Sequence, residues 1–272
     1  MECVLCGGKK FKKLHVINNL SVDRCLNCGL IATHGKTKTS YENYHRDEDY
    51  QIFEKMFRNI FLKRLLLMNR FISSRKRRVL DIGCSTGVFL KLFKDKGCEV
   101  WGVEPSESGE VAKEKGIKVL RSTFEKARLP SNYFDVVILN HTLEHVINPI
   151  VVLKKVRTIL KNSGIVFVDV PNFGSLSSKI FGYYWRFLTP EEHLFHFTFE
   201  TLKRVFEKAG FKVIHQESRS GLLEFANPWL ELLDALTTLK KRFITNLITF
   251  PYSLITTWLN MGDSMSLIGK RQ

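Results

Sequence analysis

Short apolar runs rich in β-branched residues alternate with helical patterns from residue 79 to the end of the chain. This alternation predicts an α/β fold with a doubly wound, mostly parallel sheet, in which helices cover both faces and ligands bind at the carboxyl ends of the strands. The expected strands are Val79–Gly83, Glu99–Glu104, Ile117–Leu120, Phe134–Asn140, Ile165–Val170, Phe211–Gln216 and Ser264–Arg271.

The first strand leads into a glycine-rich turn, Asp81-Ile-Gly83-Cys-Ser85-Thr-Gly87, and an amphipathic helix follows it. Glycine allows a sharp turn and the close approach of a ligand. The second strand ends in Glu104, whose carboxylate is placed to accept both ribose hydroxyls of a nucleoside. A dinucleotide requires the middle glycine of G-x-G-x-x-G, where this chain has Ser85. The loop therefore favours S-adenosylmethionine, which has no phosphate.

With these residues the chain resembles the class I S-adenosylmethionine-dependent methyltransferases. DIGCSTG is similar to their first motif, GVEPS to the acidic end of the second strand, and STFEKARLP and FDVVILNHTLEHV to the ends of the third and fourth strands. The resemblance covers about residues 79–270. It implies a Rossmann-like sheet of seven strands whose last strand, Ser264–Arg271, is antiparallel.

The resemblance also implies roles for individual residues. Ser85 departs from the family, which commonly has glycine there, so its contact with the cofactor stays open. The implied cofactor contacts are Asp81, Gly83 and Gly87 at the methionine moiety, Glu104 at the ribose, Phe124 and Glu125 near the adenine, and Asn140 near the reaction centre.

Four cysteines near the N-terminus form two C-x2-C pairs, Cys3 with Cys6 and Cys25 with Cys28, and a glycine follows each pair. Four thiolates at this spacing suit a tetrahedral, closed zinc site. We predict a zinc ribbon over residues 1–40 whose folding depends on the metal. Four unligated cysteines or a redox pair are the alternatives.

Residues 41–75 are expected to connect the ribbon to the sheet, with a helix from Tyr50 to about Ser73. Tyr41, Tyr44 and Trp185 are candidates for a lid over the substrate.

The methyltransferase domain is predicted over residues 76–272, with an apolar helical insertion at about 222–260. Within it, Phe243–Gly262 lacks charge, yet Asn246, Pro251 and several hydroxyl groups make it a poor membrane span. Packing onto the sheet is the simplest expectation, and a helix pair at a membrane surface is the alternative.

The chain is strongly basic, with 42 Lys and Arg against 27 Asp and Glu and a formal net charge of +15. Such a charge favours an anionic partner, whether nucleic acid, a membrane surface or a phosphorylated substrate. Met1–Gly8 has neither the basic stretch nor the apolar run of a secretory signal. A cytoplasmic protein is therefore expected, with peripheral membrane contact through residues 222–260 as a further possibility.

The segment His141-Thr-Leu-Glu144-His145 matches H-x-x-E-H, in which two histidines bind zinc and the glutamate activates water. That site requires a helix, whereas these residues follow a strand and precede Pro149. They instead resemble the fourth-strand end of O-methylating enzymes of the ubiquinone pathway. In some of those enzymes carboxylates here and the histidine bind a divalent ion, so a metal at Glu144 and His145 stays an alternative.

A second pair of histidines, His193 and His196, lies in TPEEHLFHFTFE after the fifth expected strand. Methyl transfer to a hydroxyl needs a base to remove the proton, and histidine suits that task. We take His193 first, then His141 and His145, as candidates for the base, with His196 beside them.

The motifs HTLEHV, VPN at 170–172 and HLFHFT resemble small-molecule and cell-envelope glycan methyltransferases. The resemblance implies a small or lipid-linked acceptor, with the methyl group going to a hydroxyl of a sugar, nucleotide sugar or quinone-like metabolite. A ribosomal RNA base methyltransferase with a zinc ribbon is one alternative, although the fourth-strand end lacks N-P-P-Y or D-P-P-Y. A non-catalytic scaffold with a vestigial cofactor pocket is the other. The oligomeric state stays open.

Overall fold

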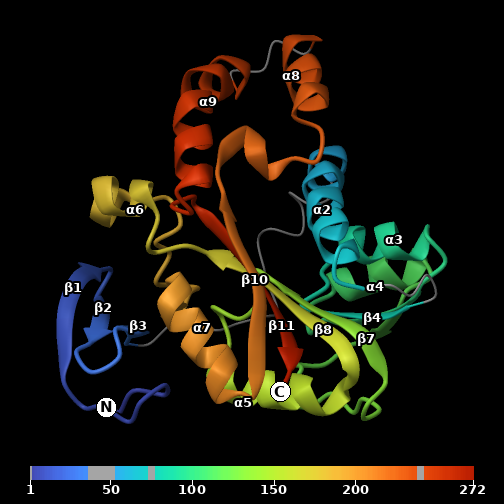
Figure 1. The fold of residues 1–272 in the computed structure, drawn as a ribbon, viewed down its shortest axis with the longest axis horizontal. Coiled ribbons are helices and arrows are strands. Elements are labelled where there is room, and N and C mark those ends of the chain that lie inside the picture. The colour runs from blue at the N-terminus through green and yellow to red at the C-terminus, as the bar shows by residue number, and fades with distance from the viewer. Residues whose placement is uncertain (1, 36–52, 73–76, 238–241) are drawn as a thin grey trace.

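A seven-stranded sheet forms the centre of the molecule (Figure 1). The computed structural model describes residues 2–35, 53–72, 77–237 and 242–272. The strands of the central sheet are β4 (Arg78–Ile82), β5 (Glu99–Val103), β6 (Lys118–Leu120), β7 (Phe134–Asn140), β8 (Leu160–Pro171), β10 (Phe211–Arg219) and β11 (Ser264–Arg271).

The strand order is β10-β11-β8-β7-β4-β5-β6. Strands β4 to β8 pair in parallel, and β11 runs antiparallel to both of its neighbours, β8 and β10. The predicted α/β fold with an antiparallel last strand is therefore confirmed.

Helices cover both faces of the sheet, and alternate residues of the strands divide between them. On β7, Val137 and Leu139 pack with one set of helices, while Val136 and Ile138 pack with the other. This is the period-two alternation of a strand buried on both sides. The first face carries α5 (Pro149–Ile159) and α7 (Phe199–Lys208), and the second carries α2 (Glu54–Asn69), α3 (Val88–Lys94) and α4 (Ser108–Glu114).

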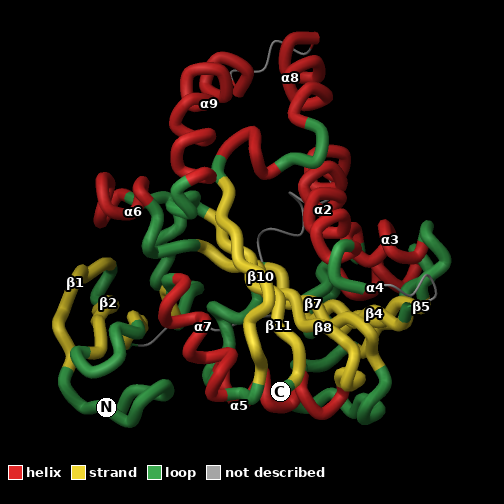
Figure 2. The backbone as a smooth tube through the Cα atoms, in the orientation of Figure 1, coloured by secondary structure: helices red, strands yellow, loops and turns green. Residues whose placement is uncertain are grey.

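A separate four-stranded sheet lies beside α7 (Figure 2). Three of its strands belong to the N-terminal segment, and the fourth is the two-residue β9 (Phe195–His196), which pairs with β3. Arg204 and Lys208 of α7 donate hydrogen bonds to carbonyl groups of the cysteine turns. The N-terminal strands are β1 (Phe11–Ile17), β2 (Leu20–Cys25) and β3 (Ile31–His34).

The apolar insertion lies at the carboxyl edge of the parallel strands, at the top of Figure 1. Helix α9 contacts the short helix η3 and strand β10 of the sheet, and it leaves large apolar side chains exposed. The described helices include none long and apolar enough to cross a membrane. The elements at this edge are α6 (Leu176–Phe181), η2 (Gly182–Tyr184), η3 (Gly221–Glu224), α8 (Pro228–Thr237) and α9 (Arg242–Trp258).

The predicted helix from Tyr50 to Ser73 corresponds to α2 within the described residues. Trp185 is buried against Val22 and Ile31 of the N-terminal strands, so it belongs to that interface. Tyr41 and Tyr44 lie outside the described residues. The domain limits at residues 40 and 75 stay predictions.

Candidate active site

The loop between β4 and α3 turns through three residues with left-handed backbone conformation. Gly83 and Gly87 have φ of 78° and 75°, and Ser85 has φ of 43°. A Cβ on Gly83 would lie 2.7 Å from the hydroxyl oxygen of Thr142, so the neighbouring chain also excludes a side chain there. Ser85 adopts the conformation that glycine favours, and the departure from the family pattern thus leaves the shape of the turn in place.

Glu104, at the end of β5, fastens this loop. Its carboxylate accepts hydrogen bonds from the backbone N–H groups of Ser85 and Ser106, both at 2.9 Å. Burial, and then the nearby charge of Glu104, raises the pKa of Asp81 well above its usual value. Two carboxyl groups therefore lie at adjacent strand ends, where a nucleoside is expected to bind.

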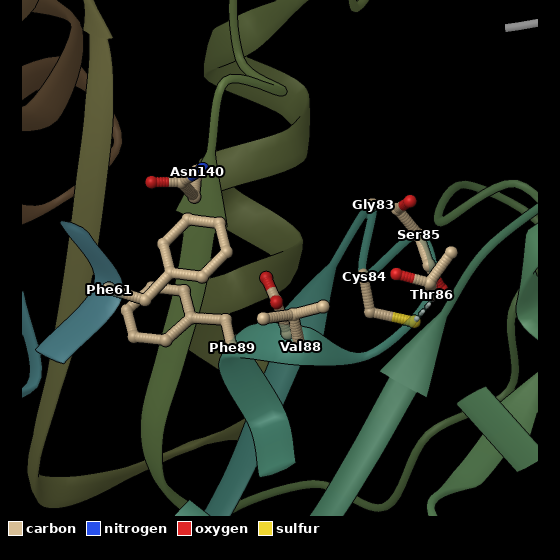
Figure 3. Close-up of a pocket in the computed structure, with 9 residues that line it drawn as sticks. Phe61, Gly83, Cys84, Ser85, Thr86, Val88, Phe89 and Asn140 are labelled. Atoms are coloured by element: carbon tan, nitrogen blue, oxygen red, sulfur yellow. Dashed lines mark hydrogen bonds between the residues drawn. The ribbon is translucent and has the colours of Figure 1, made fainter. Parts of the chain in front are cut away.

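A pocket opens beside this loop (Figure 3). Asp81, Gly83, Ser85 and Asn140 all line it, so the structure brings these predicted cofactor residues together. Phe61 of α2 enters from the side and stacks on Phe89, with ring centroids 4.6 Å apart.

Three buried polar atoms of the pocket have no hydrogen-bond partner in the described part of the chain. They are Oδ1 of Asp81, Oγ1 of Thr86 and Oδ1 of Asn140. Buried polar groups are normally paired, so unpaired ones lining a pocket indicate a ligand that supplies the partners. This observation fits S-adenosylmethionine, whose amino and hydroxyl groups are hydrogen-bond donors.

Phe124 and Glu125, the residues expected near the adenine, lie elsewhere. Phe124 is buried in the core beneath the ammonium of Lys155, and Glu125 is exposed. Among the described residues, neither lines the pocket. Their predicted role stays untested.

The candidate catalytic histidines surround the buried carboxylate of Glu144, which is 1% exposed. Nδ1 of His141 lies 3.3 Å from Glu144 Oε1, and Nε2 of His145 lies 4.0 Å from the same atom. The rings of His145 and His193 are 4.8 Å apart. Ligand atoms of Glu144, His145 and His193 all lie within 4.8 Å of one another, so these three side chains could also hold a metal ion.

Different surroundings give these histidines different proton affinities. Burial alone would lower the pKa of His141, but the carboxylates of Glu144 and Asp169 raise it above the usual value. His196 is also buried, and burial lowers its pKa to about 3, with the charge of His15 acting in the same direction. His141 therefore binds a proton more tightly than an unperturbed histidine does, whereas His196 is neutral near pH 7.

Contacts with β3 hold the loop that carries His193. Oγ1 of Thr33 donates to the carbonyl oxygen of His193 at 2.8 Å and lies 2.9 Å from Nε2 of His196. The backbone N–H of Thr33 donates to the carbonyl oxygen of Leu194 at 2.9 Å. The N-terminal segment therefore positions the histidine loop, which the sequence analysis did not foresee.

A buried ion-pair network that the sequence analysis also missed lies next to His141. Asp169 on β8 accepts from Arg219 at 2.7 Å and lies 3.2 Å from Nε of Arg64. Arg64 in turn pairs with Glu224 at 2.6 Å. Burial alone would raise the pKa of Asp169, but the two guanidinium groups hold it well below its usual range.

The four N-terminal cysteines converge at one point. Sγ of Cys3 lies 3.5 Å from Sγ of Cys28, and Sγ of Cys6 lies 3.6 Å from Sγ of Cys25. A tetrahedral site with Zn–S bonds of about 2.3 Å has sulfur atoms separated by about 3.8 Å, so the four thiols fit a zinc ion closely. The backbone N–H of Gly8 also points at Cys6 Sγ, at 3.3 Å.

Comparisons with known proteins agree with this architecture. A family model described as a methyltransferase domain matches residues 50–216. An uncharacterized protein of Methanocaldococcus jannaschii is 30% identical over 191 residues, which are 67% of this chain and 78% of that protein. A ubiquinone biosynthesis O-methyltransferase of Bradyrhizobium diazoefficiens is 33% identical over 102 residues, 35% of this chain and 40% of that enzyme. The match thus spans less than half of that enzyme.

Solved structures show the same fold. A SAM-dependent methyltransferase from Archaeoglobus fulgidus is 27% identical, has a TM-score of 0.55 and covers 82% of this chain and 99% of its own. A SAM-dependent methyltransferase from Thermotoga maritima has a TM-score of 0.56 at 21% identity, over 83% of this chain and 95% of its own. At that identity the second likeness concerns the fold alone.

Proposed function

Because the chain belongs to the S-adenosylmethionine-dependent methyltransferases, we propose that it methylates a hydroxyl of a small or lipid-linked acceptor. A sugar, a nucleotide sugar or a quinone-like metabolite is the class of acceptor that the motifs favour. The similarity to ubiquinone biosynthesis O-methyltransferases supports transfer to oxygen.

The observation that carries this proposal is the set of unpaired polar atoms in the pocket, on Asp81, Thr86 and Asn140. Bound S-adenosylmethionine supplies a methyl group on a positively charged sulfur. The oxygens of Asp81 and Asn140 would accept hydrogen bonds from the methionine end, and Glu104 has lone pairs left that would hold the ribose. Ser85 contributes through its backbone, which holds Glu104 in place.

His145 is one candidate for the base, and its hydrogen bonding fixes which ring nitrogen carries the hydrogen. Its Nδ1 lies 2.9 Å from the carbonyl oxygen of Glu192, and a carbonyl can only accept. Nδ1 therefore carries the hydrogen, and Nε2 of the neutral ring carries the lone pair that a base needs. Glu144 would stabilise the imidazolium that forms. His193, the first of the predicted candidates, packs against His145. His141, whose pKa is raised, is better suited to binding negative charge than to removing a proton.

We propose further that Cys3, Cys6, Cys25 and Cys28 hold one structural zinc ion, as their sulfur positions favour. The ribbon then orders β3, and β3 holds the loop of His193. The proposed role of the ribbon is to support the active site.

The proposed function is tested with two glutamate variants on the same strand. Glu104→Ala should weaken S-adenosylmethionine binding at least about tenfold in calorimetry, because charged hydrogen-bond partners contribute roughly 1.5–3 kcal/mol each. Glu99→Ala, at the opposite end of β5, should leave the affinity unchanged.

The same variants identify the acceptor in cells. A deletion strain should accumulate an unmethylated metabolite or glycan that is lighter by one CH2 than the product in wild-type cells. Complementation with the wild-type or Glu99→Ala gene should remove this species, and the Glu104→Ala gene should not. No heat of binding with the wild-type protein would refute the cofactor assignment. A methyl group missing from ribosomal RNA in the deletion strain would favour the RNA alternative instead.

A further inference from the structure

Over residues 248–258, helix α9 has its polar and apolar sides reversed relative to a helix of a water-soluble protein. Ser253 and Thr256 face the protein and are 1% and 0% exposed, whereas Ile255 and Trp258 are 55% and 82% exposed. A surface helix normally turns its apolar side chains to the core. The outward side of α9 therefore suits an apolar medium.

The hydroxyl groups of Ser253 and Thr256 are satisfied within the helix itself. Ser253 Oγ donates to the carbonyl oxygen of Thr249 at 3.0 Å, and Thr256 Oγ1 donates to that of Tyr252 at 2.8 Å. On the same side a Cβ at Gly221 would come within 2.5 Å of Ser253 Oγ, so η3 is packed closely against α9. The orientation of the helix is thus fixed by this contact, and its apolar side has to face outward.

Helices α6 and α8 lie at the same edge of the sheet as α9 (Figure 1), and they also carry exposed apolar side chains. The backbone N–H of Leu176, at the start of α6, donates to the carbonyl oxygen of Met261 at 3.0 Å, which joins α6 to the end of α9. We call this surface the apolar rim. Its exposed members are Ile180, Phe181, Tyr183 and Tyr184 on α6 and η2, Trp229, Leu230, Leu233 and Leu236 on α8, and Ile248, Phe250, Leu254, Ile255, Trp258 and Leu259 on or just after α9.

Charge and side-chain type indicate what the apolar rim contacts. Lys179 and Arg186 are exposed on either side of the tyrosines of η2, and residues 176–188 contain no acidic residue. Tryptophan and tyrosine mixed with lysine and arginine are typical of side chains at the interface between lipid and water. A second copy of this chain, with its own net charge of +15, would instead bring like charges together across a two-fold axis.

We propose that the apolar rim docks onto the surface of an anionic phospholipid bilayer. The described helices do not cross the membrane, so α8, α9 and α6 would lie in its interface, with the sheet outside. This inference deepens the proposed function, on which it rests. Because the rim and the cofactor loop share the carboxyl edge of the sheet, docking would present a lipid-linked acceptor to the pocket.

Vesicle sedimentation with the full-length protein tests the proposal. The wild-type protein should sediment with vesicles of phosphatidylglycerol and phosphatidylcholine, and more weakly with phosphatidylcholine alone. Ile255→Glu with Trp258→Glu should lower the partition coefficient for the mixed vesicles roughly 100-fold, about tenfold for each large apolar side chain kept out of the interface.

A matched variant separates insertion from net charge. Val151→Glu with Leu26→Glu replaces two side chains that are 56% and 59% exposed, on α5 and on the ribbon. It changes the net charge by the same amount but lies away from the rim, so its partition coefficient should stay within about threefold of wild type.

Three results would overturn the inference. In the first, the wild-type protein stays in the supernatant with mixed vesicles. In the second, both double variants lose the same fraction of their partition coefficient. In the third, the wild-type protein is a dimer that Ile255→Glu with Trp258→Glu dissociates, which would make a second copy the occupant of the rim. Calorimetry with S-adenosylmethionine on the same preparations separates this failure from that of the proposed function. If the protein binds S-adenosylmethionine but does not sediment with vesicles, only the docking proposal is refuted.

Discussion

The N-terminal ribbon and the α8–α9 segment both extend the methyltransferase sheet, yet they are built in opposite ways. The ribbon buries three of its four cysteines, Cys3, Cys25 and Cys28, and joins the histidine loop through backbone hydrogen bonds between β3 and β9. The α8–α9 segment turns hydroxyl groups inward and apolar side chains outward. The ribbon therefore packs against the loop that carries the candidate catalytic histidines, whereas the α8–α9 segment leaves an apolar surface for a partner outside the chain.

The two additions are also fastened by different forces. Around Thr33 the ribbon uses uncharged hydrogen bonds, whereas the base of the α8–α9 segment rests on the buried ion pairs of Arg64, Asp169 and Glu224. Buried charges are costly to leave unpaired, so breaking the ion pairs should mainly lower the free energy of unfolding. Breaking the contacts of the ribbon should mainly lower the rate of methyl transfer. Three substitutions test this difference.

The largest effect is expected from Cys25→Ser, which removes one zinc ligand. A ribbon this small has little core, and structural zinc contributes roughly 10–16 kcal/mol to the folding of such units. The variant should lose its zinc and its ordered β3, and methyl transfer should fall at least about 100-fold, because a displaced catalytic loop costs about that much. Zinc analysis and activity measurements check both losses.

The cofactor pocket provides the control for this variant. Its lining residues lie on α2, β4, α3 and β7 and on the loop between β4 and α3, so the affinity of Cys25→Ser for S-adenosylmethionine should stay within about threefold of wild type. A zinc-free wild-type protein, or an active Cys25→Ser variant, would contradict the supporting role of the ribbon. Cys98→Ser, outside the cluster, should change neither zinc content nor activity.

The second prediction concerns the ion-pair network below α8 and α9. Asp169→Asn leaves two buried guanidinium groups without their shared carboxylate and should lower the free energy of unfolding by about 3–5 kcal/mol at pH 7. Asp95→Asn, which breaks partly exposed pairs with Arg58 and Lys91, should cost less than about 1 kcal/mol. Urea unfolding measures both.

The pH dependence of this difference has a definite sign. The pKa of Asp169 is lowered in the folded protein, so its stabilising effect is complete above the unfolded value of about 3.9 and is lost as the pH falls below it. The difference in free energy of unfolding between the wild type and Asp169→Asn should therefore become smaller below pH 4. A gap that widened on acidification would show that the network does not depend on the ionised carboxylate.

The central sheet was predictable because its signals are local. Each strand shows as a short apolar run, and the turn from Asp81 to Gly87 carries its own glycine pattern. The pairing of β3 with β9 was not predictable, because β9 has two residues and its partner lies more than 150 residues away in the chain. The alternation of aromatic and polar residues from Phe195 to Phe199 is compatible with a strand, but nothing in it identifies β3 as the partner.

The ion-pair network left a partial signal in the sequence. Arg64 interrupts the apolar side of a helix, and Asp169 interrupts the apolar strand Ile165–Val170. A charge in either position indicates a buried partner, because isolated buried charges are too costly. The sequence marks both residues but does not pair them, since the contact depends on how α2 crosses the end of β8.

The smallest effect is expected from Thr33→Val, which keeps the ribbon and its zinc but removes the hydroxyl that contacts His193 and His196. One hydrogen bond contributes roughly 1 kcal/mol, so kcat should fall about fivefold while S-adenosylmethionine binding is unchanged. Thr158→Val, whose hydroxyl donates to Lys155 on α5, is the matched control and should leave kcat at the wild-type value. If kcat fell equally in both variants, loss of stability would explain the result. If it fell in neither, the backbone pairing of β3 with β9 would hold the loop without help from the Thr33 hydroxyl.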